Sequence, residues 1–266
     1  MQTPLKKLIA PVLCYFGERK LNRLDAHLTK PPILIGGCAR SGTTLLLAIL
    51  SAHPDIYAFP EELGVFDSWE QTGYDHKGGD EYVPKRLDRF YRTILLTSFP
   101  EHVSRWCEKT PANVLHFDKI LEYFNGDVRL IHLIRDGRDV VTSVHPSDPD
   151  SYWVPPERWI RDVSAGLDYS DHPKVTTVKY RALVMDYEET IAELTAFLGE
   201  EFHRNLQHWE EHTAVKGRRA WFHGARSIHG KSIGRWEQPE HADRIEQVMQ
   251  NERFVQLMAE QGYLEK

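Results

Sequence analysis

The chain has 266 residues, of which 41% are hydrophobic and 27% are charged, and its formal net charge is −6. A chain of this length can bury a sizeable core in one large or two small domains. The composition excludes a disordered or collagen-like chain, and the mild acidity excludes a basic protein that coats nucleic acid. No nucleic-acid partner is therefore expected.

The three cysteines, Cys14, Cys38 and Cys107, are odd in number and form no C-x-x-C pair. This usage is typical of a reducing compartment, so we expect a cytoplasmic protein without a disulfide framework. No apolar run reaches the length of a membrane span, so no transmembrane segment is expected. The stretch 8–16 contains Pro11 and runs into charged residues, which favours an amphipathic helix within an N-terminal helical extension over residues 1–30.

Nearly continuous apolar runs predict buried parallel strands, and segments with helical periodicity lie between them. The expected strands are 33–37, 104–107, 128–134 and 175–180. The expected helices are 43–52, 88–97, 112–123, 156–168, 186–198 and 239–260. Strands that alternate with helices predict an α/β protein with a P-loop-like three-layer fold, in which helices flank a central parallel sheet. No linker divides the chain, so one domain over residues 1–266 is expected.

A glycine-containing loop, residues 37–44, follows the first expected strand and opens a helix. It matches the phosphate loop G-x-x-x-x-G-K-[ST] at both glycines and at the final threonine, but a threonine stands in the lysine position. Backbone amides at a helix N-terminus bind anions. The amides expected to hold a phosphate are those of Ser41, Gly42, Thr43 and Thr44.

Thr43 stands where a lysine would reach the β- and γ-phosphates of a triphosphate. Without that cation, the loop fits a single 5′-phosphate that carries a transferable group, and Arg40 inside the loop can supply the charge. A second anion site is predicted where Arg135 follows the strand 128–134, because an arginine there can contact a phosphate bidentately. Ser143, expected on the following helix, can offer a hydroxyl to the same anion.

These motifs resemble the sulfotransferases that use 3′-phosphoadenosine 5′-phosphosulfate (PAPS), and most of all their tyrosylprotein and heparan-sulfate branch. The resemblance is carried by residues 40–45, 52–55, 61–62, 108–113, 133–143 and 178–183. It implies that the loop holds the 5′-phosphosulfate, that Arg135 and Ser143 hold the 3′-phosphate, and that Tyr180 approaches the adenosine. Arg181 and Ala182 stand where the family has an acidic pair, so only Tyr180 is carried over from that segment.

The resemblance implies transfer of a sulfuryl group from PAPS to a hydroxyl, less readily an amine, of a small-molecule, carbohydrate or peptidyl acceptor, with 3′-phosphoadenosine 5′-phosphate (PAP) as product. Glu62 is the expected general base, and Glu61 is the alternative, since a shift of one residue is open here. Arg40 and Lys109 are expected to stabilise charge on the bridging and sulfuryl oxygens. No metal is expected, because the donor lacks the polyphosphate that magnesium bridges.

Residues 213–236 contain six Lys or Arg and no Asp or Glu. Such a stretch attracts anions, and its glycines indicate a loop. It resembles the late loop of the family, which covers the donor, and the expected donor contacts are Lys231, Ser232 and Arg235. A solvated basic loop, or a patch for an acidic partner, is the alternative.

Two competing functions and two further sequence features keep alternatives open. A P-loop nucleotide kinase-like enzyme and a non-catalytic phosphonucleotide-binding protein are the competing functions. Residues 208–212 read H-x-x-E-H, a zinc-protease pattern, although an exposed polar helix is the favoured interpretation. Tyr152, Trp153 and Trp159 lie near the second anion motif, where they either form a wall for the acceptor or pack the loop.

Overall fold

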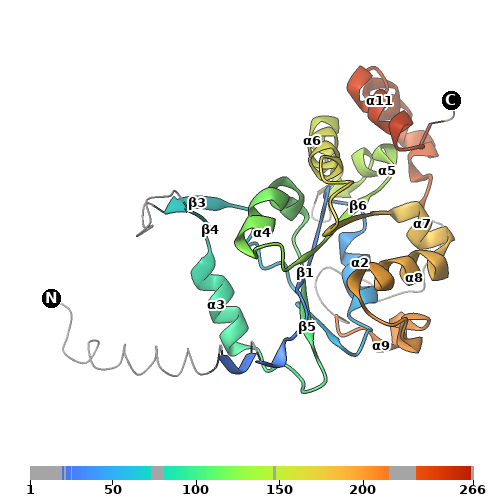
Figure 1. Ribbon diagram of the computed structural model, residues 1–266. Coiled ribbons are helices and arrows are strands. Elements are labelled where there is room, and N and C mark those ends of the chain that lie inside the picture. The colour runs from blue at the N-terminus through green and yellow to red at the C-terminus, as the bar shows by residue number, and fades with distance from the viewer. Residues whose placement is uncertain are drawn as a thin grey trace.

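The computed structural model describes residues 20, 22–24, 26–72, 81–145, 148–215 and 232–264. At its centre lies a parallel sheet of five strands in the order β2-β5-β1-β6-β9, with helices on both faces (Figure 1). In that order the strands are β2 (Ile56–Ala58), β5 (Arg105–Lys109), β1 (Ile33–Gly37), β6 (Arg129–Ile134) and β9 (Val175–Lys179). The predicted α/β fold with a central parallel sheet is confirmed.

Apolar runs form β1 and β6 because both faces of the sheet are covered there. Strands β1 and β5 are buried over their whole length. Successive side chains of a strand point to opposite faces, and in β1 Ile33 and Ile35 join one core cluster whereas Leu34 joins another. The strand sequence thus supplies both halves of the core.

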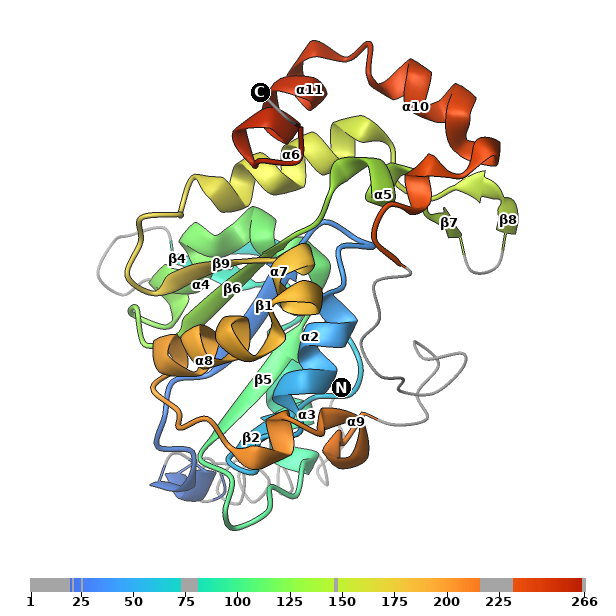
Figure 2. The ribbon, with the colours of Figure 1, turned by 90° about the vertical axis from the view of Figure 1, so that its right-hand side faces the viewer.

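Two helical layers cover the sheet (Figures 1 and 2). One face packs against α2 (Thr43–Leu50), α7 (Tyr180–Met185), α8 (Tyr187–Leu198) and α9 (Trp209–His212). The other packs against α3 (Leu87–Leu96), the 3-10 helix η1 (Pro111–His116) and α4 (Phe117–Tyr123). A third apolar cluster joins α5 (Gly137–Val141), α6 (Pro156–Leu167), α10 (Ala242–Val248) and α11 (Glu252–Glu260).

The single long helix predicted over 239–260 is wrong. The segment consists of a 3-10 turn, η5 (Pro239–His241), followed by α10 and α11. The break occurs at Asn251, whose side-chain oxygen accepts a hydrogen bond from the amide of Phe254 at 3.1 Å and so caps a new helix. Similarly, the helix predicted over 112–123 begins as the 3-10 helix η1 and continues as α4.

Two antiparallel hairpins were not predicted, because their strands lack an alternating apolar pattern. One pairs β3 (Trp69–Thr72) with β4 (Glu81–Pro84), and the other pairs β7 (Val144–His145) with β8 (Asp148–Tyr152). The expected helix at 8–16 lies outside the described residues. Of the helices in the part of the chain that is described, none combines the length and apolar character that crossing a membrane requires.

His132 lies on β6 in the middle of the core, and its side chain is fully buried. Neither ring nitrogen has a hydrogen-bond partner in the described structure. The backbone of Gly166 in α6 packs so closely on the imidazole that a Cβ at that position would lie 2.3 Å from the ring. Burial lowers the pKa of His132 to about 3, so this histidine is neutral in the folded protein.

The stability of the protein is therefore expected to fall in mild acid through His132. The unfolded chain binds a proton below about pH 6.5, whereas the folded chain does not until about pH 3. This group alone should lower the free energy of unfolding by about 2 kcal/mol between pH 7.5 and 5. Denaturant unfolding at both pH values should show that loss in the wild type and a smaller loss in His132→Leu; equal losses in the two proteins would contradict it.

Candidate functional site

The carboxyl ends of the five strands gather most of the predicted site residues at one edge of the sheet. Because all five strands are parallel, these ends lie together, which is where ligands bind in open α/β sheets. Glu62 follows β2, Lys109 ends β5, the loop 37–44 follows β1, Arg135 follows β6 and Tyr180 follows β9. Segments far apart in the sequence thus converge on one place.

The loop between β1 and α2 has the backbone of an anion cradle. Gly42 has a φ of 97°, and a Cβ on it would lie 2.5 Å from the ring of Tyr180, so only glycine fits. The amide of Ser41 donates to the carbonyl of Cys38 at 3.1 Å and stabilises the loop itself. The amides of residues 42–44 were predicted, together with that of Ser41, to bind the phosphate. At the N-terminus of α2 they have no acceptor within the helix, so they stay candidate phosphate donors.

The hydroxyl of Ser41 marks the cradle as a site for a polar ligand. The Ser41 side chain is fully buried, and its Oγ makes no hydrogen bond with the described residues. A buried hydroxyl without a partner costs free energy. An anion bound in the loop would supply the missing acceptor.

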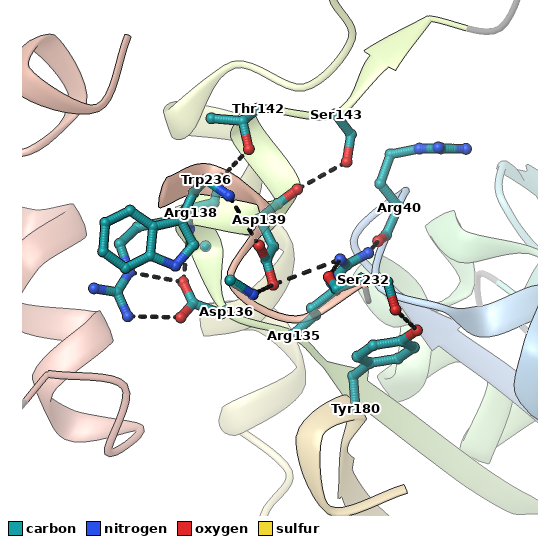
Figure 3. A network of polar contacts seen from close by, with 12 residues as sticks. Arg40, Arg135, Asp136, Arg138, Asp139, Thr142, Ser143, Tyr180, Ser232 and Trp236 are labelled. Atoms are coloured by element: carbon teal, nitrogen blue, oxygen red, sulfur yellow. Dashed lines mark hydrogen bonds and ion pairs between the residues drawn. The ribbon is translucent and has the colours of Figure 1, made fainter. Parts of the chain in front are cut away.

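Arg40 adds positive charge to this loop. Burial, together with the nearby charges of Arg135 and Arg235, lowers the pKa of the Arg40 guanidinium. Its carbonyl faces Arg135, but its guanidinium extends away from Arg135 (Figure 3) and lies 5.6 Å from the ring centre of Trp153. Two separated cations are the arrangement that a ligand with two anionic ends requires.

Arg135 is nearly buried and is surrounded by protein groups (Figure 3). One terminal nitrogen donates to the carbonyl of Arg40 at 3.0 Å, and the other donates to the carbonyl of Ser232 and lies 3.5 Å from Asp139. The guanidinium stacks on Tyr180, with 4.7 Å to the ring centre. Its Nε is buried without a partner. A bidentate phosphate contact of Arg135 stays a prediction.

The segment 232–236 is held directly over this arginine. The hydroxyls of Tyr180 and Ser232 lie 2.7 Å apart, and the carboxylate of Asp139 accepts hydrogen bonds from the amides of Gly234 and Trp236 at 3.2 and 3.4 Å. The Arg138 guanidinium stacks on Trp236 at 3.9 Å. Sequence reasoning missed the anchoring roles of Asp139 and Arg138, although both belong to the motif that contains Arg135.

Of the predicted basic segment 213–236, residues 216–231 lie outside the described residues, and Lys231 is among them. Ser232 is described in contact with both Arg135 and Tyr180. Arg235 is exposed, and its charge acts on Arg40. The described end of the segment therefore does lie at the predicted site.

Lys109 and Glu62 form an ion pair on the side of β1 that faces β5, away from β6 and Arg135. Lys109 Nζ lies 2.5 Å from Glu62 Oε1, and the two side chains are 6% and 50% exposed. A carboxylate that is half open to solvent and held by a buried ammonium can meet an incoming acceptor. The choice of Glu62 over Glu61 as the base stays a prediction.

Comparison with known proteins agrees with this geometry. A sequence model described as "Sulfotransferase family" matches residues 31–204. The chain belongs to the sulfotransferase family. It is 27% identical over 197 residues to a putative protein-tyrosine sulfotransferase of Caenorhabditis briggsae, covering 67% of this chain and 69% of that one. It is 29% identical over 203 residues to protein-tyrosine sulfotransferase 1 of Danio rerio, covering 68% and 56%.

Solved structures confirm the fold of this sulfotransferase. The sulfotransferase domain of the Synechococcus PCC 7002 olefin synthase superposes with a TM-score of 0.54 at 19% identity, covering 83% of this chain and 95% of that domain. Mouse sulfotransferase SULT7A1, complexed with PAP, gives 0.54 at 15% identity, covering 86% and 88%. The chain spans only part of some relatives: 56% of the Danio rerio protein and 40% of a protein-tyrosine sulfotransferase of Drosophila melanogaster.

The expected placement of Ser143 on a helix is wrong. Helix α5 ends at Val141, and Ser143 lies beyond it, where the chain turns into β7. Its hydroxyl donates to the carbonyl of Asp139 at 2.8 Å, and its carbonyl accepts the amide of Trp153 at 3.0 Å. Ser143 therefore ties the start of the β7–β8 hairpin to α5, and a phosphate contact from it stays a prediction.

The three aromatic residues near the second anion motif differ in role. Trp159 is fully buried, and its indole nitrogen donates to the carbonyl of Arg135 at 3.1 Å, so it packs the core. The Tyr152 hydroxyl lies 3.1 Å from His241 Nδ1. Trp153 is 37% exposed and is the one of the three that lies beside Arg40. Of the proposed acceptor wall, Tyr152 and Trp153 stay candidates, and the contact with Arg40 favours Trp153.

The zinc interpretation of residues 208–212 finds no support in the geometry. Helix α9 spans four residues there, and Trp209 within it is buried in the core. In the described ranges, side chains able to share a metal gather instead at His53, Asp55 and Glu200.

The cluster of His53, Asp55 and Glu200 belongs to a network of ion pairs and hydrogen bonds. Glu200 lies 2.5 Å from Lys30 and 3.0 Å from Arg105. One ring nitrogen of His53 accepts the amide of Asp55, and the other lies 3.1 Å from the carbonyl of Glu201. The Glu200 carboxylate and both ring nitrogens of His53 are thus engaged by protein groups.

Proposed function

We propose that this sulfotransferase transfers the sulfuryl group of PAPS to a hydroxyl group and releases PAP. The observation that carries the proposal is the convergence of two cationic sites, the loop with Arg40 and the segment that begins with Arg135, at the carboxyl edge of one sheet. Ser41 Oγ and Arg135 Nε are buried there without partners, which fits a ligand with two phosphates. The likeness to a mouse sulfotransferase complexed with PAP supports the choice of donor.

In this proposal Glu62 accepts the proton of the acceptor hydroxyl as the oxygen attacks sulfur. A sulfur–oxygen bond forms to the acceptor, and the bond from sulfur to the 5′-phosphate oxygen breaks, which leaves PAP. Lys109, held 2.5 Å from Glu62, lies on the acceptor side and stabilises the sulfuryl oxygens. Arg40 and the amides at the start of α2 stabilise the charge that grows on the leaving phosphate.

Ligand protection against thermal unfolding tests the donor. PAP at saturating concentration is expected to raise the melting temperature, whereas ATP is not, because Thr43 replaces the lysine that a triphosphate requires. Protection by ATP alone would favour the kinase-like alternative. Transfer of a radiolabelled sulfuryl group from PAPS then separates an enzyme from a non-catalytic phosphonucleotide-binding protein.

The acceptor that we propose is the phenolic hydroxyl of a tyrosine in a peptide. The named relatives are protein-tyrosine sulfotransferases, and the exposed Trp153 beside Arg40 offers an aromatic face for a phenol ring. Small-molecule and carbohydrate acceptors are the other outcomes of a screen with labelled PAPS.

Trp153→Ala is expected to raise the KM for a tyrosyl peptide about three- to tenfold, the size of one lost aromatic contact. The KM for PAPS should stay unchanged. Tyr152→Phe, on the adjacent residue, is the matched control and should leave both constants as they are. Steady-state kinetics with each substrate varied in turn measures both. An unchanged peptide KM in Trp153→Ala would remove Trp153 from the acceptor site.

We also propose a cytoplasmic location, on the cysteine usage of the sequence. Cys38 and Cys107 are buried thiols without a disulfide. Fractionation of the native cells should recover the protein in the soluble cell contents, and recovery from membranes or the medium would contradict the proposal.

A further inference from the structure

Glu108 is a fully buried carboxylate on β5, directly before Lys109. It pairs in register with Leu34 of β1, on the face of the sheet that packs against η1 and α4. Burial raises the pKa of Glu108, and hydrogen bonds from Thr110, Asn113 and the amide of Leu63 oppose that shift. A buried carboxylate is costly, and an apolar residue of similar size is often no less stable. Core packing alone therefore does not explain a glutamate here.

The partners of Glu108 come from the elements that build the reacting centre. Its Oε1 accepts the amide of Leu63 at 3.2 Å and the hydroxyl of Thr110, and its Oε2 accepts Asn113 Nδ2 at 2.8 Å. Leu63 is the residue directly after Glu62. Asn113 Nδ2 also donates to the carbonyl of Ile35 at 3.2 Å, on the strand that leads into the phosphate loop.

Thr110 extends the same network by one residue. While its hydroxyl donates to Glu108, it accepts the amide of Gly64 at 3.2 Å. The amides of two consecutive residues, Leu63 and Gly64, thus donate hydrogen bonds to the Glu108 carboxylate and to the Thr110 hydroxyl. The backbone that carries Glu62 is tied to β5, which carries Lys109, and to β1.

We propose that Glu108 is a positioning residue for sulfuryl transfer: it fixes residues 63–64 so that the Glu62 carboxylate stays against Lys109 Nζ, in register with the phosphate loop. The inference rests on the proposed function, in which Glu62 is the base. Glu108 touches neither donor nor acceptor in this role. It acts through the backbone that follows Glu62, where a displacement of about 1 Å can cost a hundredfold in rate.

Thr110→Val and Thr110→Ser form the matched pair that tests the proposal. Valine keeps the shape of threonine but removes the hydroxyl between Glu108 and the Gly64 amide, whereas serine retains it. Thr110→Val is expected to lower kcat about 10- to 100-fold and to leave the Kd for PAP within about twofold. Thr110→Ser should keep kcat within about threefold of the wild type.

Glu108→Gln is the second variant. Glutamine has one oxygen where the carboxylate has two, so its NH2 group faces a donor, either the Leu63 amide or Asn113 Nδ2, and one of these two hydrogen bonds breaks while the side-chain volume is kept. We expect the same split, with kcat reduced and PAP affinity retained, and calorimetric binding of PAP shows that the variant is folded.

The possible outcomes separate the two proposals. Equal kcat in Thr110→Val and Thr110→Ser, or a parallel loss of kcat and PAP affinity in Thr110→Val, would overturn the positioning role alone. Failure of the wild type to bind PAP or to transfer the sulfuryl group would overturn the proposed function and this inference with it.

Discussion

Glu62→Gln is expected to lower kcat about 10²- to 10⁴-fold, the usual contribution of a general base. Glutamine can still accept a hydrogen bond from Lys109 Nζ, which lies 2.5 Å from the carboxylate in the wild type. The local structure should therefore survive, and the Kd for PAP should change by less than about twofold, because in the proposed mechanism Glu62 meets the acceptor and not the donor. Single-turnover kinetics with labelled PAPS and calorimetric titration with PAP measure the two quantities separately.

Glu61→Gln is the control on the neighbouring residue. Both carboxylates are exposed, but the contact with Lys109 Nζ comes from Glu62. If Glu61→Gln carried the loss of turnover and Glu62→Gln did not, the base would be Glu61. Turnover near the wild-type rate in both variants would exclude a carboxylate base from this segment.

Arg135→Ala is expected to weaken PAP binding at least about a hundredfold, since a charge-assisted contact with a phosphate is lost in a nearly buried site. The same change removes the cation 3.5 Å from Asp139, whose side chain is 1% exposed. Leaving that carboxylate without its partner should also lower the free energy of unfolding by about 3 kcal/mol. Calorimetry and denaturant unfolding test the two effects independently.

Two further variants separate charge from position in this experiment. Arg135→Lys keeps the positive charge but loses the planar fork, so it should recover much of the stability and less of the PAP affinity. Arg129→Ala removes an arginine from the opposite end of the same strand, β6, and should leave PAP binding unchanged. Wild-type affinity in Arg135→Ala would refute the assignment of the 3′-phosphate site.

The sequence by itself predicted a central parallel sheet and placed the two anion motifs at one edge of it. Strands β1 and β6 follow from apolar runs, because a strand buried on both faces needs apolar residues at nearly every position. The loop 37–44 and the motif around Arg135 are contiguous, so their spacing is visible along the chain. Both follow a strand of one parallel sheet, which was enough to place them at a common edge.

Only the tertiary structure decided which distant residues meet. The contact of Glu62 with Lys109, the buried hydrogen bonds of Glu108 to Leu63 and Asn113, and the anchoring of residues 234–236 by Asp139 join different elements. Such contacts depend on strand register and on where short elements end. A shift of one residue in a strand reverses the face of every side chain, and local sequence patterns do not determine that register across the sheet.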